Sequence, residues 1–243
     1  MPEPDSMSPR ERLIVALDVP GADEARRLVE RVGPAAGMFK VGSQLFTAAG
    51  PSLVRELTRA GRRVFLDLKY HDIPNTVASA VRAAGDLGVS LIDVHALGGA
   101  AMIEAAAAAR PAGARLLAIT ILTSHDEATL LAIGLCGSLT DNVRRLALLA
   151  QAAGADGVVA SPHEVGLIRE ACGAAFLIVT PGIRPAGAQM HDQARAATPA
   201  AALAAGASYL VVGRPITEAA DPAAAAQAIV REMGAAGPQG DGR

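Results

Sequence analysis

Eight short apolar runs recur along the chain, and longer segments of helical character separate them. Most of these runs are near-continuous stretches of Val, Ile and Leu, a pattern typical of strands buried on both faces of a parallel sheet. We therefore expect strands at residues 12–17, 38–41, 64–68, 91–95, 116–122, 157–160, 176–180 and 209–212.

The segments between these runs have helical periodicity, and several end in glycine, a common helix stop. We expect helices at residues 22–32, 52–60, 76–87, 100–109, 141–153 and 199–205. Eight such units in 243 residues predict an α/β fold of the (β/α)8 TIM-barrel type, a single domain at 12–233 between tails at 1–11 and 234–243. A doubly wound open sheet is the alternative, but the chain lacks a Gly-x-Gly-x-x-Gly turn.

The composition excludes several classes of protein. A net charge of −2 gives no basic bias toward nucleic acid or membrane surfaces, and aromatic residues, at 2%, are too scarce for base-stacking platforms. No apolar run approaches the ~18 residues of a membrane span. The polar N-terminal segment lacks a signal-peptide core, and two cysteines make no disulfide framework. We expect a cytoplasmic protein that binds neither nucleic acid nor membrane.

Polar residues stand at the carboxyl end of every expected strand, where barrel enzymes place their catalytic groups. A single aspartate at such a position often caps the following helix, but eight polar strand ends are harder to explain in that way. In chain order these residues are Asp18, Lys40, Asp67 with Lys69 and Asp72, His95, Thr123, Ser161, Arg184, and Gly213 with Arg214.

The most specific motif is Asp67-x-Lys69-x-x-Asp72, which contains one of the two lysines in the chain. Residues two apart in a strand point to the same face, so Asp67 and Lys69 should both face the barrel mouth. Buried charges need partners, and we therefore expect a network of alternating sign that includes Lys40, the other lysine. Such a network can hold an ammonium protonated and aimed. The alternative is an ion cluster with a purely structural role.

The loops after the seventh and eighth strands predict a phosphate site. Barrels often bind phosphate there, with a helix start that offers free N–H groups. Gly213 permits close approach of the backbone, and Arg184 and Arg214 supply charged donors. Residues 182–193 form a long loop that we expect to act as a lid. The alternative is a glycine turn beside two surface arginines. The five histidines lack metal-ligand spacing, so we expect no metal site.

These motifs resemble those of bacterial orotidine 5′-phosphate decarboxylases. The likeness runs from about residue 12 to residue 232, and its most specific part is Ile-Pro-Asn-Thr after the Asp-x-Lys-x-x-Asp core. The matching segments are Phe65-Leu66-Asp67-Leu68-Lys69-Tyr70-His71-Asp72-Ile73-Pro74-Asn75-Thr76-Val77, Ala16-Leu17-Asp18, Phe39-Lys40-Val41-Gly42, Val94-His95-Ala96, Leu122-Thr123-Ser124, Thr180-Pro181-Gly182-Ile183-Arg184-Pro185, Asp192-Gln193 and Val212-Gly213-Arg214-Pro215.

The resemblance implies a cofactor-independent conversion of orotidine 5′-phosphate to uridine 5′-phosphate and carbon dioxide in a homodimer with shared active sites. It implies that Lys69 protonates C6, that Asp67 sits beside the substrate carboxylate, and that Lys40 and Asp18 hold the ribose. The remaining implied contacts are Thr123 and the Pro181 backbone at the pyrimidine, Arg184, Gln193, Gly213 and Arg214 at the phosphate, and Asp72 with Thr76 reaching the neighbouring subunit's site.

Two rival functions stay open at this point. Hexulose-phosphate synthases and ketogulonate-phosphate decarboxylases share the Asp-x-Lys-x-x-Asp core but use magnesium to stabilise an enediolate. The residues from Ile73 to Thr76, together with Gln193, favour the pyrimidine enzyme. The other rival is a phosphate-ligand binder without catalysis, which the intact Asp67, Lys69 and Asp72 disfavour.

Overall fold

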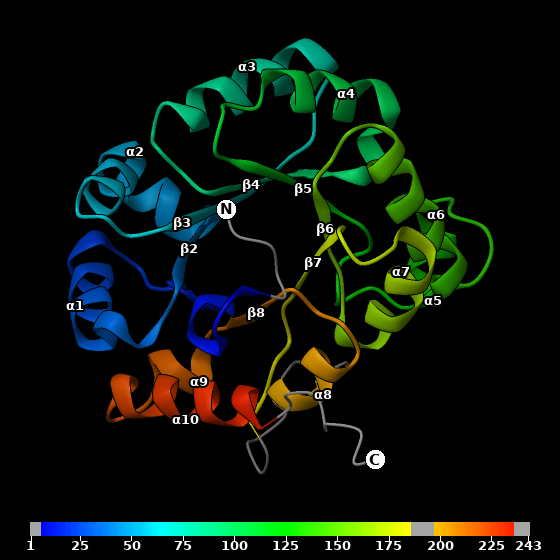
Figure 1. Ribbon diagram of the computed structural model, residues 1–243. Helices are drawn as coiled ribbons and strands as arrows, with labels where there is room; N and C mark the ends of the chain where they lie inside the picture. The colour runs from blue at the N-terminus through cyan, green and yellow to red at the C-terminus, as the bar shows by residue number, and fades with distance from the viewer. Residues whose placement is uncertain (1–5, 186–196, 236–243) are drawn as a thin grey trace.

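The computed structural model describes residues 6–185 and 197–235 and shows a closed barrel of parallel strands in chain order, surrounded by helices (Figure 1). The predicted TIM barrel is confirmed. Its strands are β1 (Leu13–Ala16), β2 (Met38–Gly42), β3 (Val64–Tyr70), β4 (Leu91–His95), β5 (Arg115–Ile119), β6 (Gly157–Val159), β7 (Leu177–Thr180) and β8 (Tyr209–Val212).

Two strands differ from the predicted limits in ways that bear on the site. β5 ends at Ile119, three residues before the predicted end, although the apolar run continues. Ile121 and Leu122 prolong that run because they line the cavity at the barrel mouth. β3 continues two residues beyond the predicted end, to Tyr70, and its register with β4 is irregular there.

The predicted helices are present, those at 22–32 and 100–109 with the predicted ends and the others with shifted ends, and the structure adds further helices. The predicted helix at 52–60 is the second half of a longer element that begins at Ser43 and kinks where Gly50 takes φ +67° before Pro51. The helices are α1 (Ala22–Val32), α2 (Ser43–Arg59), α3 (Pro74–Gly85), α4 (Ala100–Ala109), α5 (Glu127–Ala132), α6 (Leu139–Ala152), α7 (Val165–Cys172), α8 (Pro199–Ala204), α9 (Arg214–Thr217) and α10 (Pro222–Gly234), with 3-10 turns η2 (Pro9–Arg12), η3 (Gly33–Ala35), η4 (Ala96–Gly98) and η5 (Pro162–Glu164).

The core has two layers. The larger lies between strands and helices, and the smaller fills the barrel with side chains that include Met38, Phe65, Leu91 and Tyr209. Met7 belongs to the inner layer, where its sulfur accepts a hydrogen bond of 3.2 Å from the Tyr209 hydroxyl. Residues 1–5 and 236–243 of the predicted tails lie outside the described residues, and the domain limits stay a prediction.

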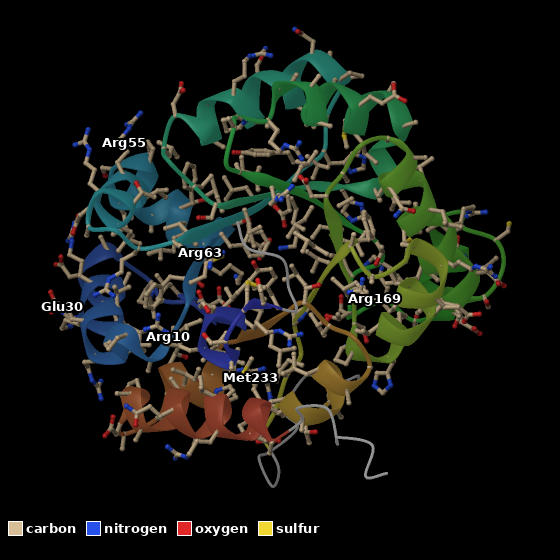
Figure 2. All side chains as sticks on the ribbon, in the orientation of Figure 1. Arg10, Glu30, Arg55, Arg63, Arg169 and Met233 are labelled. Carbon is tan, nitrogen blue, oxygen red and sulfur yellow. The ribbon has the colours of Figure 1, made fainter. Side chains whose placement is uncertain are left out.

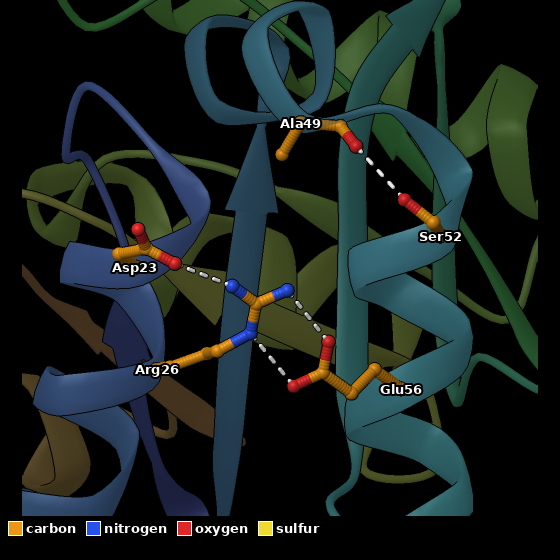
Figure 3. A network of polar contacts seen from close by, with 5 residues as sticks. All are labelled: Asp23, Arg26, Ala49, Ser52 and Glu56. Carbon is orange, nitrogen blue, oxygen red and sulfur yellow. Dashed lines mark hydrogen bonds and ion pairs between the residues drawn. The ribbon is translucent and has the colours of Figure 1, made fainter.

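Charged side chains lie on the outer faces of the surrounding helices. Glu30 and Arg55 point outward in Figure 2, as expected for solvated helix faces. Arg26 on α1 pairs with Glu56 on α2 at 2.8 Å and with Asp23 at 2.6 Å (Figure 3). These contacts link neighbouring helices on the outside of the barrel. Among the described residues, no helix is long and apolar enough to cross a membrane.

Candidate active site

A cavity of about 590 Å³ opens at the carboxyl ends of the strands. That volume lies within the range of small-molecule sites, roughly 300–1,000 Å³. The structure brings most of the predicted site residues to its wall: Asp18, Lys40, Asp67, Lys69, Thr123, Pro181, Arg184, Gly213 and Arg214. Residues that the sequence analysis did not single out also line the wall, among them the apolar Phe65, Ile119, Ile121, Val159 and Val211 and the polar Glu24, Thr217 and Glu218.

Two lysines and two aspartates form a chain of ion pairs in this wall. Lys40 Nζ lies 3.0 Å from Asp18 Oδ1 and 3.2 Å from Asp67 Oδ2. Lys69 Nζ donates to the other oxygen of Asp67. β2 and β3 are neighbours, and Gly42 pairs with Asp67, so their strand ends bring the charges together. The structure thus forms the network of alternating sign expected from the sequence.

Burial and charge act in opposite directions on this network. Burial by itself lowers the pKa of Lys40, but the Asp67 and Asp18 carboxylates outweigh it and raise the pKa above the usual value. Burial likewise raises the pKa of Asp67, yet Lys40 and Lys69 outweigh it and bring the pKa below the usual value. Both groups are therefore held in their charged forms. Asp67 is 7% exposed, whereas the Lys69 side chain is 38% exposed and faces the cavity.

Lys69 does not continue a regular strand, contrary to the simple alternation that the sequence analysis assumed. Its φ is +51°, the only positive value at a non-glycine position in the part of the chain that the structure describes. The register between β3 and β4 shifts between Leu66 and Tyr70, and the Lys69 N–H donates instead to Asp93 Oδ1 at 2.8 Å. Lys69 and Asp67 both line the cavity, but a bulge places Lys69 there.

Sequence reasoning missed Asp93, which is fully buried in β4. A signal for it was present in the sequence. Side chains alternate along a strand, so Asp93 shares the barrel-facing side of β4 with Leu91, a residue of the inner core. A carboxyl group at such a position needs a partner, and that need could have marked the residue.

The expected anion end of the cavity is built from the turns after β7 and β8. Arg184 is only 7% exposed, and its backbone N–H donates to the backbone carbonyl of Ala197 at 3.0 Å. Gly213 precedes the short helix α9, which begins at Arg214. Gln193 lies outside the described residues, as does most of the predicted lid at 182–193.

Asp72 and Thr76 do not line the cavity of this chain. They belong to an exposed stretch, residues 71–76, in which Ile73 is 67% exposed. His71 at its start stacks on His95 with ring centroids 5.4 Å apart. Burial, His71, His125 and Lys69 together lower the pKa of His95 to about 4, so this imidazole is neutral at physiological pH. Within residues 6–185 and 197–235, no cluster of three His, Cys, Asp or Glu side chains could hold a metal ion.

Comparison with known proteins agrees with this geometry. The family model for "Orotidine 5'-phosphate decarboxylase / HUMPS family" matches residues 11–229. The orotidine 5′-phosphate decarboxylase of Halorhodospira halophila is 60% identical over 229 residues, 93% of this chain and 97% of the relative, and that of Moorella thermoacetica is 56% identical over 237 residues, covering 93% and 94%.

Solved structures give the same result. The orotidine 5′-phosphate decarboxylase of Lactobacillus acidophilus superposes with a TM-score of 0.82 at 43% identity, covering 91% of this chain and 98% of that one. The enzyme of Pyrococcus horikoshii superposes with a TM-score of 0.75 at 28% identity, covering 91% and 98%. The chain belongs to the orotidine 5′-phosphate decarboxylase / HUMPS family.

Proposed function

We propose that this protein decarboxylates orotidine 5′-phosphate to uridine 5′-phosphate in de novo pyrimidine biosynthesis, without a cofactor. The observation that carries the proposal is the Lys69 ammonium, which is paired with a buried Asp67 and faces a cavity of substrate size. Relatives at 56–60% identity named orotidine 5′-phosphate decarboxylase support the choice of substrate. Two cysteines, which make no disulfide framework, fit a cytoplasmic enzyme.

In the proposed reaction, the bond between C6 and the carboxylate carbon breaks, and its electron pair stays on C6 while carbon dioxide leaves. The Lys69 ammonium then gives a proton to C6, and the neutral amine takes a proton from water in the next cycle. Because the vinylic carbanion cannot delocalise into a carbonyl, the enzyme must supply barrier lowering at the upper end of the usual ~8–23 kcal/mol.

Preorganised charge is the source of that stabilisation. Lys40 and Lys69 both pair with Asp67, so the Lys69 ammonium is held before the substrate arrives. An ammonium fixed beside a developing carbanion stabilises charge that exists only in the transition state, and it also serves as the general acid. The apolar part of the wall, which includes Phe65 and Ile119, would exclude water from that charge once the substrate fills the cavity.

The proposed substrate contacts rest on the family resemblance, and the cavity wall contains all of the residues involved except Gln193, which lies outside the described residues. We assign Asp18 and Lys40 to the ribose, and Thr123 and the Pro181 backbone to the pyrimidine. We assign the phosphate contacts to Arg184, Gly213, Arg214 and Gln193. Phosphate contacts far from C6 can contribute to the chemical step by driving closure over the substrate.

The phosphate assignment is tested with Arg214→Ala. We expect kcat/KM on orotidine 5′-phosphate to fall by about 100-fold, as for the loss of a charge-assisted bidentate contact. Activity on the phosphate-free nucleoside should stay unchanged. An equal fractional loss on both substrates would remove Arg214 from the phosphate site.

We further propose a homodimer in which Asp72 and Thr76 complete the neighbouring site. The exposed stretch at 71–76 lies directly after Lys69 and outside its own chain's cavity, and a second subunit would bury Ile73. Mixing inactive Lys69→Ala and Asp72→Ala chains should restore part of the activity, because some heterodimers carry one intact site. With subunit exchange demonstrated, failure to complement contradicts the shared site.

The family description also includes HUMPS enzymes, so a magnesium-dependent sugar-phosphate reaction is the rival. The purified protein, treated with a metal chelator, is mixed with orotidine 5′-phosphate and followed by ultraviolet absorbance. Rapid conversion to uridine 5′-phosphate supports the proposal and its metal independence. If folded protein leaves this substrate untouched, the proposal fails, and sugar phosphates with magnesium are tested next.

A further inference from the structure

Asp93 is the most deeply buried ionisable group beside the candidate active site. Its exposed fraction is 0%, and it sits in the middle of β4 between the apolar residues Ile92 and Val94. It does not line the cavity, so it cannot touch a substrate bound there. Its carboxyl group neighbours two central residues of the site: it contacts the backbone N–H of Lys69 and lies beside the side chain of Asp67.

The bond to the Lys69 backbone has a geometric reason. Between the paired positions Leu66 and Tyr70, β3 advances four residues while β4 advances two, from Ile92 to Val94. The surplus residues bulge, and the Lys69 N–H no longer meets a carbonyl of β4. Asp93 Oδ1 reaches across from β4 and accepts that N–H at 2.8 Å.

The conformation of Lys69 needs such support. A φ of +51° is left-handed, which is uncommon for a non-glycine residue and unfavourable unless the surroundings enforce it. The Asp93 carboxyl contributes one enforcing contact, on the backbone of the residue whose side chain pairs with Asp67. A shift of this backbone would move the Lys69 ammonium in the cavity.

The second oxygen of Asp93 indicates its protonation state. Among the described residues, Oδ2 has no donor, and the nearby Asp67 carboxylate already accepts from Lys40 and Lys69. Two adjacent buried carboxylates are costly unless one carries a proton, which then bridges them. Burial and the Asp67 charge both raise the pKa of Asp93 well above the usual value, in agreement with a neutral Asp93.

We propose that Asp93 is a positioning residue of this decarboxylase: as a neutral acid it accepts the Lys69 N–H, donates to Asp67, and so fixes the Lys69 ammonium for proton transfer. This inference rests on the proposed function. The role differs from general structural support because it acts on the geometry of one side chain.

Three substitutions separate positioning from structural support. Asp93→Asn keeps an oxygen for the Lys69 N–H and an N–H for Asp67, so it imitates the neutral acid. Asp93→Ala removes both contacts, and Asp93→Leu does the same while filling the volume. Ser208→Ala is the matched control, because Ser208 is 1% exposed and its Oγ accepts a strand N–H, from Ile178 at 3.0 Å, outside the cavity wall.

We expect Asp93→Ala and Asp93→Leu to lower kcat by about 100-fold with KM unchanged, as for a misplacement of about 1 Å. The kcat of Asp93→Asn should stay within about threefold of the wild-type value, because the Lys69 ammonium keeps its position relative to the reacting carbon. Activity is expressed per folded molecule, measured by circular dichroism and by stoichiometric binding of uridine 5′-phosphate. Crystal structures should show φ of Lys69 leaving the positive region in Asp93→Ala and remaining there in Asp93→Asn.

Three results overturn the inference. One is an Asp93→Ala or Asp93→Leu enzyme with wild-type kcat, and another is an Asp93→Asn enzyme as impaired as these two. The third is an unchanged Lys69 conformation in Asp93→Ala. If Asp93→Ala does not fold, Asp93→Leu and Asp93→Asn still decide the question. Inactivity of the wild-type protein on orotidine 5′-phosphate is a different outcome, because it contradicts the proposed function itself.

Discussion

The described part of the barrel has a partly buried ion cluster at each end, and the two clusters are built differently. The mouth cluster consists of Asp18, Lys40, Asp67 and Lys69 at the carboxyl ends of β1 to β3. The floor cluster consists of Arg110, Arg115 and Asp156 at the opposite ends of β5 and β6. Each contains a largely buried aspartate, Asp67 or Asp156, between two cations, so charge pairing alone does not distinguish a reactive site from a structural one.

The two clusters differ in the type of cation and in whether a cation faces a cavity. At the floor, Asp156 accepts from Arg115 Nη1 at 2.9 Å, from the Leu116 N–H at 2.7 Å, and from Arg110. Arginine stays protonated, so this cluster can only hold strands together. At the mouth the cations are the two lysines of a chain that has 22 Lys and Arg in total, and Lys69 faces a cavity from a strained backbone. Lysine can give up a proton there.

The largest expected effect comes from replacing the lysine of the mouth cluster that faces the cavity with arginine, the cation of the floor cluster. Lys69→Arg keeps the charge, but arginine does not release its proton, so we expect kcat to fall by at least about 1,000-fold. The melting temperature should change little, since Lys69 is partly exposed. Ultraviolet assays of orotidine 5′-phosphate turnover give kcat, and circular dichroism verifies folding. Retention of a tenth of wild-type turnover would falsify the role of Lys69 as the acid.

Arg115→Lys is the matched control for this prediction, because it makes the reverse exchange at the floor. It keeps a cation beside Asp156 and lies outside the cavity wall, so kcat should equal that of wild type. A comparable loss of turnover in Arg115→Lys would mean that exchanging the two cations affects the enzyme generally rather than its proton transfer.

The second largest effect is on stability. Asp156→Ala leaves Arg110 and Arg115 without their carboxylate and removes the acceptor of a strand N–H. Removing one partner of a buried pair costs about 3–5 kcal/mol, and we expect the lower part of that range because Arg115 is 40% exposed. Urea denaturation measures the loss. Turnover per folded molecule should stay at the wild-type value, and a selective loss of kcat would contradict the division between floor and mouth.

The contrast between the two ends also explains what could be predicted from the sequence. Apolar runs report burial, so all eight strands and the barrel were predictable, as was the gathering of Asp18, Lys40, Asp67 and Lys69 at one end. The end of β5 was predicted wrongly because the apolar residues Ile121 and Leu122 line the cavity rather than continue the strand.

The backbone of Lys69 was beyond sequence reasoning because it depends on a tertiary contact. A positive φ at lysine contradicts local propensity, and it persists where a residue 24 positions further along accepts its N–H. Nothing within the Asp-x-Lys-x-x-Asp motif points to Asp93. The signal lay in β4, as an ionisable residue between the apolar residues Ile92 and Val94 on the inner face of the strand.

A smaller effect concerns the pH dependence of stability. An acid whose pKa is higher in the folded than in the unfolded protein makes the folded state bind more protons, so stability falls as pH rises above the unfolded value, about 4 for aspartate. Burial and Asp67 raise the pKa of Asp93 in this way. Asp93→Asn removes this dependence, so its stability relative to wild type should increase from about pH 4 toward alkaline pH. Urea titrations at several pH values measure the difference, and a constant difference would contradict a protonated Asp93.

The smallest effect is expected at a third ion cluster, on the outside of the barrel. Arg26 bridges Asp23 and Glu56 with geometry as good as that of the buried clusters, at 2.6 Å and 2.8 Å (Figure 3). These side chains are 41–82% exposed, so water and salt screen the charges and the ordered side chains lose entropy. Arg26→Ala should therefore be indistinguishable from wild type in urea denaturation and in kcat. A clear loss of stability would show that contact geometry, rather than burial, determines the strength of the ion pairs in this protein, and the floor cluster would then need no special explanation.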